Sequence, residues 1–228
     1  MEKTIKERIK KFKQNNPFKT QTDIAYELIR SDILEFRLKP NEKINQDAIS
    51  IDFDMSRTPI RDAILKLEQD GLVVQAAKGY QVFEMSVKDY MDFHEFRIRL
   101  ETYATMLATR LMTDNQILEL KDSLREFNKY CEQGNLEMAA IYDEKFHELI
   151  IKGSRNEYVI KTHELFSSKQ KYYLQRLIKM GLFDVSYAVA KKKHLEIYRA
   201  ICERDEKRAE EAMRSHLAFY RHRMYDLL

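Results

Sequence analysis

The stretch MSRTPIRDAILKLEQDGL, from Met55 to Leu72, carries the features that decide the fold of the first part of the chain. It begins with helix-start chemistry, because a serine or threonine can cap a helix and Pro59 is tolerated in a first turn, where its missing N–H would have no intrahelical partner. Ile60, Ile64 and Leu67 then repeat at helical spacing. The stretch is therefore predicted to be an amphipathic helix that buries this apolar stripe.

The residues around this helix predict a winged helix-turn-helix over residues 21–86. Apolar positions at helical spacing indicate a first helix that begins at Gln21 and ends before the turn at Pro40 and Asn41. A short second helix follows Asn45, a plausible N-cap. The segments LVVQ and YQVF are typical of two short strands joined by a turn with Gly79 at its tip. Three helices followed by a small hairpin define this fold.

Two arginines, Arg57 and Arg61, lie one helical turn apart at the start of the third helix and away from its apolar stripe. In a winged helix-turn-helix this end enters the major groove, where an arginine can donate two hydrogen bonds to guanine O6 and N7. On an isolated helix such a pair would be solvated surface, but the short preceding helix and the wing favour DNA. We therefore predict base contacts from both arginines. The expected phosphate or wing contacts come from Ser56, Thr58, Gln46, Lys78 and Gly79.

Charge is unevenly distributed along the chain. The net charge is +3, yet residues 1–20 hold seven Lys/Arg against two acidic residues, whereas residues 21–86 hold eight against twelve. Net charge alone therefore does not indicate a DNA-binding domain. The prediction of DNA binding depends on where individual cations lie. We interpret residues 1–20 as a flexible basic tail that could add nonspecific phosphate contacts.

The sequence gives no sign of a membrane or secreted protein. No stretch approaches the roughly 18 apolar residues of a membrane span, and the N-terminus lacks the apolar core of a signal peptide. Cys131 and Cys202 are too few for a disulfide framework. We expect a cytoplasmic protein with no membrane partner.

The run from Ile29 to Val73 resembles the DNA-binding domain of GntR-family bacterial transcription regulators, whose signature centres on SRTPVREAL-like residues, here Ser56 to Leu65. Two positions depart from the family pattern. Asp54 stands where the family usually has glycine, and Asn41 stands where its Pro-Gly turn usually falls. Because Asp and Asn tolerate left-handed backbone better than most residues, we expect both turns to survive. The resemblance implies binding to double-stranded DNA.

After the wing the chain shows only long amphipathic segments, which predict an all-helical bundle over residues 87–228. The sequence contains no phosphate-binding glycine loop and no GxSxG nucleophile motif. The whole protein is therefore expected to be mainly α. The six predicted helices span about 87–111, 114–132, 136–152, 155–180, 186–203 and 206–226.

Four side chains of the types that bind metals lie on the helix faces that are predicted to point into the bundle. Asp143 and His147 are four residues apart and so lie on one helix face. His194 and His216 each fall in phase with apolar residues of later helices. Buried imidazole and carboxylate groups are costly unless they are hydrogen-bonded, paired or bound to metal. The spacing alone leaves two interpretations open, which are a shared metal site and a set of separately satisfied histidines.

The arrangement resembles the FCD group of GntR regulators, in which a Dx3H pair and two later histidines hold a divalent metal. The stretch FRIRLE, Phe96 to Glu101, and Asn156 resemble further family motifs, and the six-helix count suits the shorter variant of the group. The resemblance implies a homodimer with a small organic-acid effector whose carboxylate binds the metal. Zinc is the first expectation for the metal, with nickel or manganese as alternatives. The implied ligands are Asp143, His147, His194 and His216.

A cation near the cavity would help to hold an anionic effector, and Arg97 is the first expectation for it, with Arg176 as the second. Both could instead form salt bridges. His163 and Gln170 could line the same cavity. We expect His94 and His222 to lie on the surface.

These features predict a metabolite-responsive transcription regulator that binds a palindromic operator as a dimer. Two alternatives stay open. The metal could be purely structural, with DNA binding independent of any ligand. Less favoured is a metal-dependent hydrolase-type enzyme, since an open Asp/His site can activate water but no general acid or base stands out nearby. Glu144 is adjacent to Asp143 but points to a different helix face.

Overall fold

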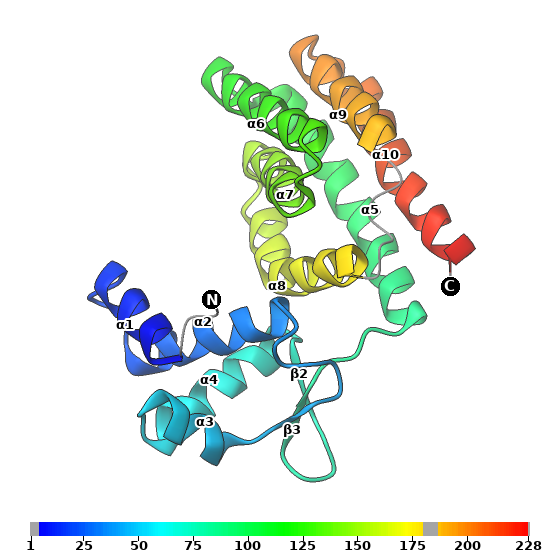
Figure 1. Ribbon diagram of the computed structural model, residues 1–228. Helices are drawn as coiled ribbons and strands as arrows, with labels where there is room; N and C mark the ends of the chain where they lie inside the picture. The colour runs from blue at the N-terminus through cyan, green and yellow to red at the C-terminus, as the bar shows by residue number, and fades with distance from the viewer. Residues whose placement is uncertain (1–4, 180–186, 228) are drawn as a thin grey trace. The chain divides into compact units, whose positions relative to one another are not determined.

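The computed structural model describes residues 5–179 and 187–227, and the chain divides into two compact units (Figure 1). The first unit comprises residues up to Met85 together with Phe166–Gln175. The second comprises Ser86–Leu165 and Arg176–Leu228. Each unit is built around its own set of helices.

The first unit contains a winged helix-turn-helix, which confirms the predicted fold. Three helices precede two strands of the wing, and a further strand, β1, pairs antiparallel with β3 so that the sheet order is β1-β3-β2. The two-residue strand β1 was not expected, because so short a strand carries no alternating pattern. The elements are α2 (Gln21–Leu34), β1 (Lys43–Ile44), α3 (Gln46–Phe53), α4 (Arg57–Gln69), β2 (Val73–Gln75) and β3 (Tyr80–Val82).

Local sequence accounts for the ends and turns of these elements. Thr20 forms a capping box with Asp23 at the start of α2. The Asn45 side chain accepts hydrogen bonds from backbone N–H groups at the start of α3. Asp54 and Asn41 have φ of 51° and 63°, so both adopt the left-handed backbone expected of them. The predicted apolar stripes of α2 and α4 are all at most 5% exposed: Ile24, Leu28, Ile29, Ile33, Ile60, Ile64 and Leu67.

One expectation for this unit was wrong. The predicted flexible tail contains a helix, α1 (Ile5–Asn15), whose Ile9 is buried. In α3, Phe53 is buried but Ala48 is exposed. Lys66 of α4 pairs with Asp23 of α2 at 2.9 Å.

The second unit is an all-helical bundle, and its helix bounds agree with the predicted ones within two residues. Ser86 and Thr113 form capping boxes at the starts of α5 and α6. The predicted turn at 181–184 lies outside the described residues. The helices are α5 (Val87–Leu111), α6 (Asp114–Glu132), α7 (Leu136–Gly153), α8 (Glu157–Lys179), α9 (Tyr187–Cys202) and α10 (Glu206–Leu227). The Phe166–Gln175 segment of α8 groups with the first unit, and the rest of α8 with the second.

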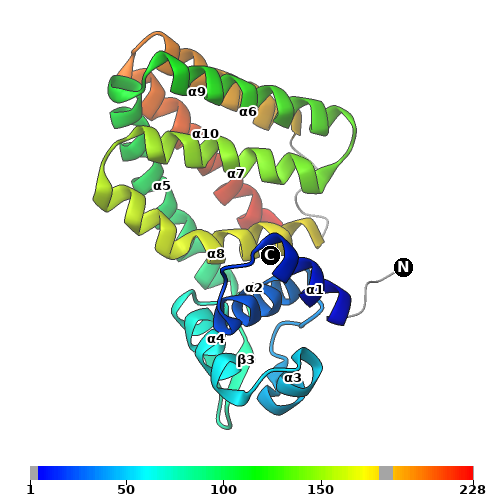
Figure 2. The same cartoon turned by 90° about the vertical axis from the view of Figure 1, so that its left-hand side faces the viewer.

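Helix α5 packs against α7, α9 and α10, and α6 packs against α7 and α9 (Figures 1 and 2). Their apolar faces meet in one core that includes Phe127, Phe146, Ile197 and Met213, each at most 1% exposed. In the part of the chain that the structure describes, no helix is long and apolar enough to cross a bilayer. The bundle thus places the inward faces of α7, α9 and α10 beside α5.

His94 of α5 is buried, which corrects the expectation that it lies on the surface. Its ring is 3% exposed and lies 5.3 Å from the ring of Tyr90, centroid to centroid. Burial lowers the pKa of His94 to about 3, because the charged imidazolium would lose its hydration. The side chain of His222 lies outside the described residues.

The buried His94 predicts a loss of stability in acid. Its unfolded pKa is near 6.5 and its folded pKa near 3, so below pH 6.5 the unfolded chain binds a proton that the folded chain does not. The free energy of unfolding therefore falls as pH is lowered. From about pH 7.5 to about pH 5 this group alone should cost about 2 kcal/mol. In melts followed by circular dichroism, His94→Gln should lose less stability over this interval than the wild type, and equal losses would contradict the assignment.

Candidate DNA-binding surface and metal centre

The N-terminal end of α4 presents both predicted base-reading arginines to solvent. The Arg57 side chain is 79% exposed, and its Nε lies 2.9 Å from Oδ1 of Asp47 in the first turn of α3. Arg61, one turn further along α4, is also exposed. The ion pair joins the N-terminal ends of α3 and α4 but leaves the rest of the Arg57 guanidinium free to donate to another acceptor.

The other predicted DNA contacts surround this end of the unit. Ser56 is the N-cap residue of α4, and its side chain and that of Thr58 are exposed. Gln46, the first residue of α3, is half-buried. Lys78 and Gly79 are exposed in the turn between β2 and β3, where Gly79 has φ of 80°. This positive φ explains the glycine, because side chains disfavour that conformation.

The four predicted metal ligands meet in the helical unit. Asp143 and His147 come from α7, His194 from α9 and His216 from α10, and their ligand atoms all lie within 4.8 Å of one another. The three histidines are at most 1% exposed, and the Asp143 side chain is 14% exposed. The four side chains point inward, as the spacing predicted, and they meet at one point, as the family resemblance implied.

The arrangement within this cluster suits a divalent cation. Nε2 of His194 lies 3.3 Å from Oδ1 of Asp143, and Nε2 of His147 lies 3.1 Å from Nε2 of His216. Among the described residues neither ring nitrogen of His194 has a hydrogen-bond partner although both are buried. Unsatisfied buried nitrogens are costly, and a metal ion would satisfy one of them. The donor set of three imidazoles and one carboxylate fits zinc and similar ions.

Burial also sets the protonation that a metal requires. The pKa values of His194 and His216 are lowered well below the ordinary value, chiefly because burial disfavours the imidazolium. Burial raises the pKa of Asp143, against the opposing effect of the nearby His147 and Arg97. Since a histidine must be neutral to ligate a metal, the low pKa values keep the nitrogen lone pairs available at neutral pH.

Glu101 of α5 completes the surroundings of the cluster, and the sequence reasoning missed its role. It is 1% exposed, and its Oε2 lies 2.5 Å from Nδ1 of His147. Arg97, one turn earlier on α5, pairs with its other oxygen. Burial would raise the pKa of Glu101, but the charge of Arg97 and the hydrogen bond with His147 outweigh burial and lower it. The available signal was the stretch Phe96 to Glu101, in which Arg97 and Glu101 lie four residues apart.

The other residues that were expected to line an effector cavity differ in how deeply they are buried. Arg97 adjoins the cluster, but Glu101 already opposes its charge and raises its pKa against the effect of burial. Arg176 is half-buried in the last turn of α8. His163 and Gln170 are 8% and 7% exposed, and burial lowers the pKa of His163. These residues are interior, but their burial does not assign them an effector.

Comparison with known proteins supports both parts of this description. The FCD domain family matches residues 92–219, and the family described as bacterial regulatory proteins, gntR family, matches residues 21–79. The HTH-type transcriptional repressor RspR of Escherichia coli is 26% identical over 206 residues, which cover 90% of this chain and 89% of the relative. An uncharacterized HTH-type transcriptional regulator in an unstable DNA locus of Streptomyces ambofaciens is 30% identical, with 90% and 84% covered.

A solved structure shows the same fold. The E. coli protein McbR/YncC superposes with a TM-score of 0.77 at 18% identity, over 92% of this chain and 99% of that chain. The family matches and these relatives define the class of protein, a DNA-binding transcription regulator. The chain belongs to the GntR family and carries an FCD domain.

The pairing of Glu101 with Arg97 and His147 predicts a large effect of its removal. Glu101→Ala leaves a buried cation and a buried imidazole without their partner, so the helical unit should lose about 3–5 kcal/mol of stability. Glu95→Ala on the same helix is the matched control, since its side chain is 57% exposed and should change stability by less than about 0.5 kcal/mol. Hydrogen exchange of the α5 and α7 amides measures both, and equal protection in the two variants would contradict the role of Glu101.

Proposed function

We propose that this protein is a metabolite-responsive transcription regulator that binds a palindromic operator as a homodimer. Residues 21–86 form its DNA-binding domain, and residues 87–228 form a domain for metal binding, effector binding and dimerisation. The observation that carries the proposal is the convergence of Asp143, His147, His194 and His216 in a chain with an exposed winged helix-turn-helix. As a DNA-binding protein it would act in the cytoplasm.

The exposed end of α4 would read the operator. Arg57 and Arg61 would donate to guanine edges in the major groove. Ser56, Thr58 and Gln46 would hold the phosphate backbone, and Lys78 with Gly79 would contact the DNA from the wing. A two-fold symmetric dimer places two such helices in successive stretches of groove, so its operator would be a palindrome with half-sites about one helical turn apart.

The cluster in the helical unit would hold a divalent cation, zinc in the first instance, with nickel or manganese as alternatives. When bound, the cation would supply positive charge and open coordination positions for a carboxylate. Four protein groups would leave such positions open on an ion that takes five or six ligands. A small organic acid is therefore the effector class that this centre favours.

Residues around the centre would orient it. Glu101 accepts the Nδ1–H of His147 and so directs the Nε2 lone pair of that ring toward the other three ligands. Arg97 holds Glu101 in place, and any further contact that it or Arg176 makes with the effector would add charge complementarity. An effector can alter DNA affinity only if it binds the DNA-competent and incompetent states unequally. Its affinity must therefore differ between these two states of the dimer.

The arginine assignment predicts a loss of sequence-specific binding. Operator-like duplexes are first selected from a random pool with the wild type. Arg61→Ala should then bind the selected sequence with a free energy about 1–3 kcal/mol less favourable, because a bidentate guanine contact is lost. Arg125→Ala in the helical unit removes the same charge from a side chain that is 69% exposed and should bind normally. Fluorescence anisotropy gives both affinities, and undiminished selectivity in Arg61→Ala and Arg57→Ala would exclude α4 as the reader.

The ligand assignment predicts metal loss in His194→Ala. The wild type should contain a stoichiometric transition metal by mass spectrometry, and the variant should contain little, since a ligand is missing. His94→Gln changes another buried histidine of the same unit and should keep the metal.

A thermal-shift screen with small carboxylic acids extends this experiment. Acids that raise the melting temperature of the wild type but not of His194→Ala, and that change DNA affinity, would support effector binding at the centre. Metal without any acid response would instead indicate a structural metal. A wild type that binds no metal would overturn the proposal for the centre.

A further inference from the structure

We propose that helix α1 is an auxiliary DNA-binding element. In this proposal Lys6, Lys10 and Lys13 contact the phosphodiester backbone beside the base pairs that α4 reads. The inference does not depend on the metal or the effector, because it uses the DNA-binding unit alone.

The winged helix-turn-helix carries a net negative charge, although its expected partner, DNA, is a polyanion. Residues 21–86 carry eight Lys/Arg against twelve acidic residues, whereas α1 carries five Lys/Arg against one acidic residue. Phosphate contacts supply much of the affinity of DNA-binding proteins. An acidic domain therefore gains most from a basic element attached to it, and α1 is such an element within the same compact unit.

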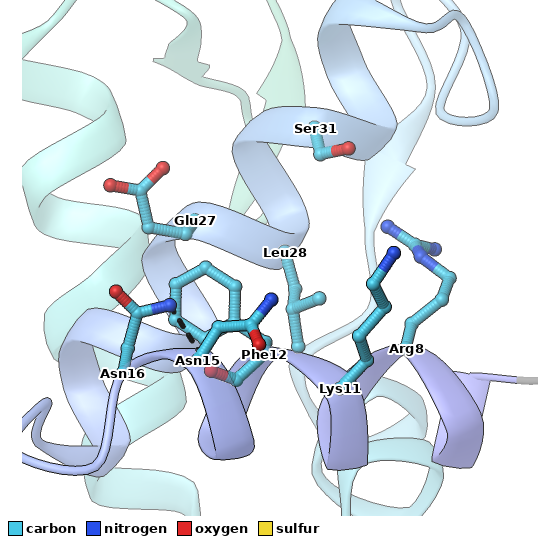
Figure 3. A pocket seen from close by; sticks show the side chains of 8 residues that line it. All are labelled: Arg8, Lys11, Phe12, Asn15, Asn16, Glu27, Leu28 and Ser31. Atoms are coloured by element: carbon cyan, nitrogen blue, oxygen red, sulfur yellow. Dashed lines mark hydrogen bonds between the residues drawn. The ribbon is translucent and has the colours of Figure 1, made fainter.

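Helix α1 is docked on the domain rather than free in solution. Its Ile9 is 8% exposed, and α1 packs against both α2 and α3. Arg8 pairs with Asp32 of α2 at 2.7 Å between Nη1 and Oδ1. Figure 3 shows Phe12 of α1 and Leu28 of α2 among the residues that line a pocket between the two helices. The burial of Ile9 and the ion pair together hold the helix in place.

Docking leaves one face of α1 available to a partner. Lys6, Lys10 and Lys13 recur at i, i+4 and i+7, so they lie on one face, and all three are exposed. They line a groove of about 390 Å³ with Phe53 and its neighbouring aspartates at the C-terminal end of α3. Arg57, the first residue of α4, follows Phe53 by four positions, so this face adjoins the helix-turn-helix.

Among the residues that the structure describes, no ion pair engages Lys6, Lys10 or Lys13. Asp52 and Asp54 line the same groove, yet among the described residues no ion pair joins either carboxylate to Lys6, Lys10 or Lys13. Ammonium groups on a docked helix are already positioned, so a phosphate contact costs less ordering entropy than it would from a flexible tail. The partner that fits a row of exposed ammonium groups beside a helix-turn-helix is the DNA backbone.

The test measures the salt dependence of nonspecific DNA binding. The full-length wild type and the triple variant Lys6→Gln/Lys10→Gln/Lys13→Gln are titrated against a labelled mixed-sequence duplex about three helical turns long, from about 50 to 200 mM salt. The control variant, Lys121→Gln/Lys145→Gln/Lys207→Gln, removes the same charge from exposed positions of the helical unit. Circular dichroism confirms that the helix content of each variant is unchanged.

Each phosphate contact contributes about 0.9 to the slope of log K against log salt concentration. The triple variant should therefore bind more weakly, and its slope should be shallower by about two to three. The control should match the wild type. An unchanged slope and affinity in the triple variant would overturn the proposal. An equal decrease in both variants would do the same, since it would reflect net charge rather than the α1 face.

Discussion

The cost of burying ionisable groups governs the helical domain. Arg97, Glu101, His147, His194 and His216 all lie in its interior together with Asp143. Each would be unfavourable alone, because a buried charge or unsatisfied polar atom loses its hydration. Contacts within the domain offset part of this desolvation cost, because Arg97 pairs with Glu101 and Glu101 with His147. Among the described residues the nitrogens of His194 have no hydrogen-bond partner, which is why the cluster suits a cation.

The DNA-binding unit follows the opposite rule. Its apolar stripes on α2 and α4 are buried, and its functional cations stay in solvent, where they keep their hydration until DNA replaces it. Arg57 is restrained only by one exposed ion pair, which contributes little to stability. One protein thus gathers ionisable side chains in the interior of one unit and keeps the arginines of the other unit exposed.

Sequence periodicity was sufficient for most of the architecture. Helices of ten or more residues repeat their apolar positions several times, so the six helices of the bundle and both long helices of the DNA-binding unit were predictable. Short or weakly patterned elements were not. Strand β1 has two residues, and α1 shows its apolar residues Ile5, Ile9 and Phe12 among many lysines, so its composition resembled a tail.

By itself, the sequence determined the fold class, the family and the set of ligand-type side chains, because these depend on spacing within single helices and on short motifs. Only the tertiary structure decided the partners. Glu101 and His147 are 46 residues apart in the chain, and no local pattern relates them. His94 is buried because the helices around α5 cover its face, not because of its neighbours in sequence. Helical phase specifies the direction of a side chain, whereas packing between helices specifies what it meets there.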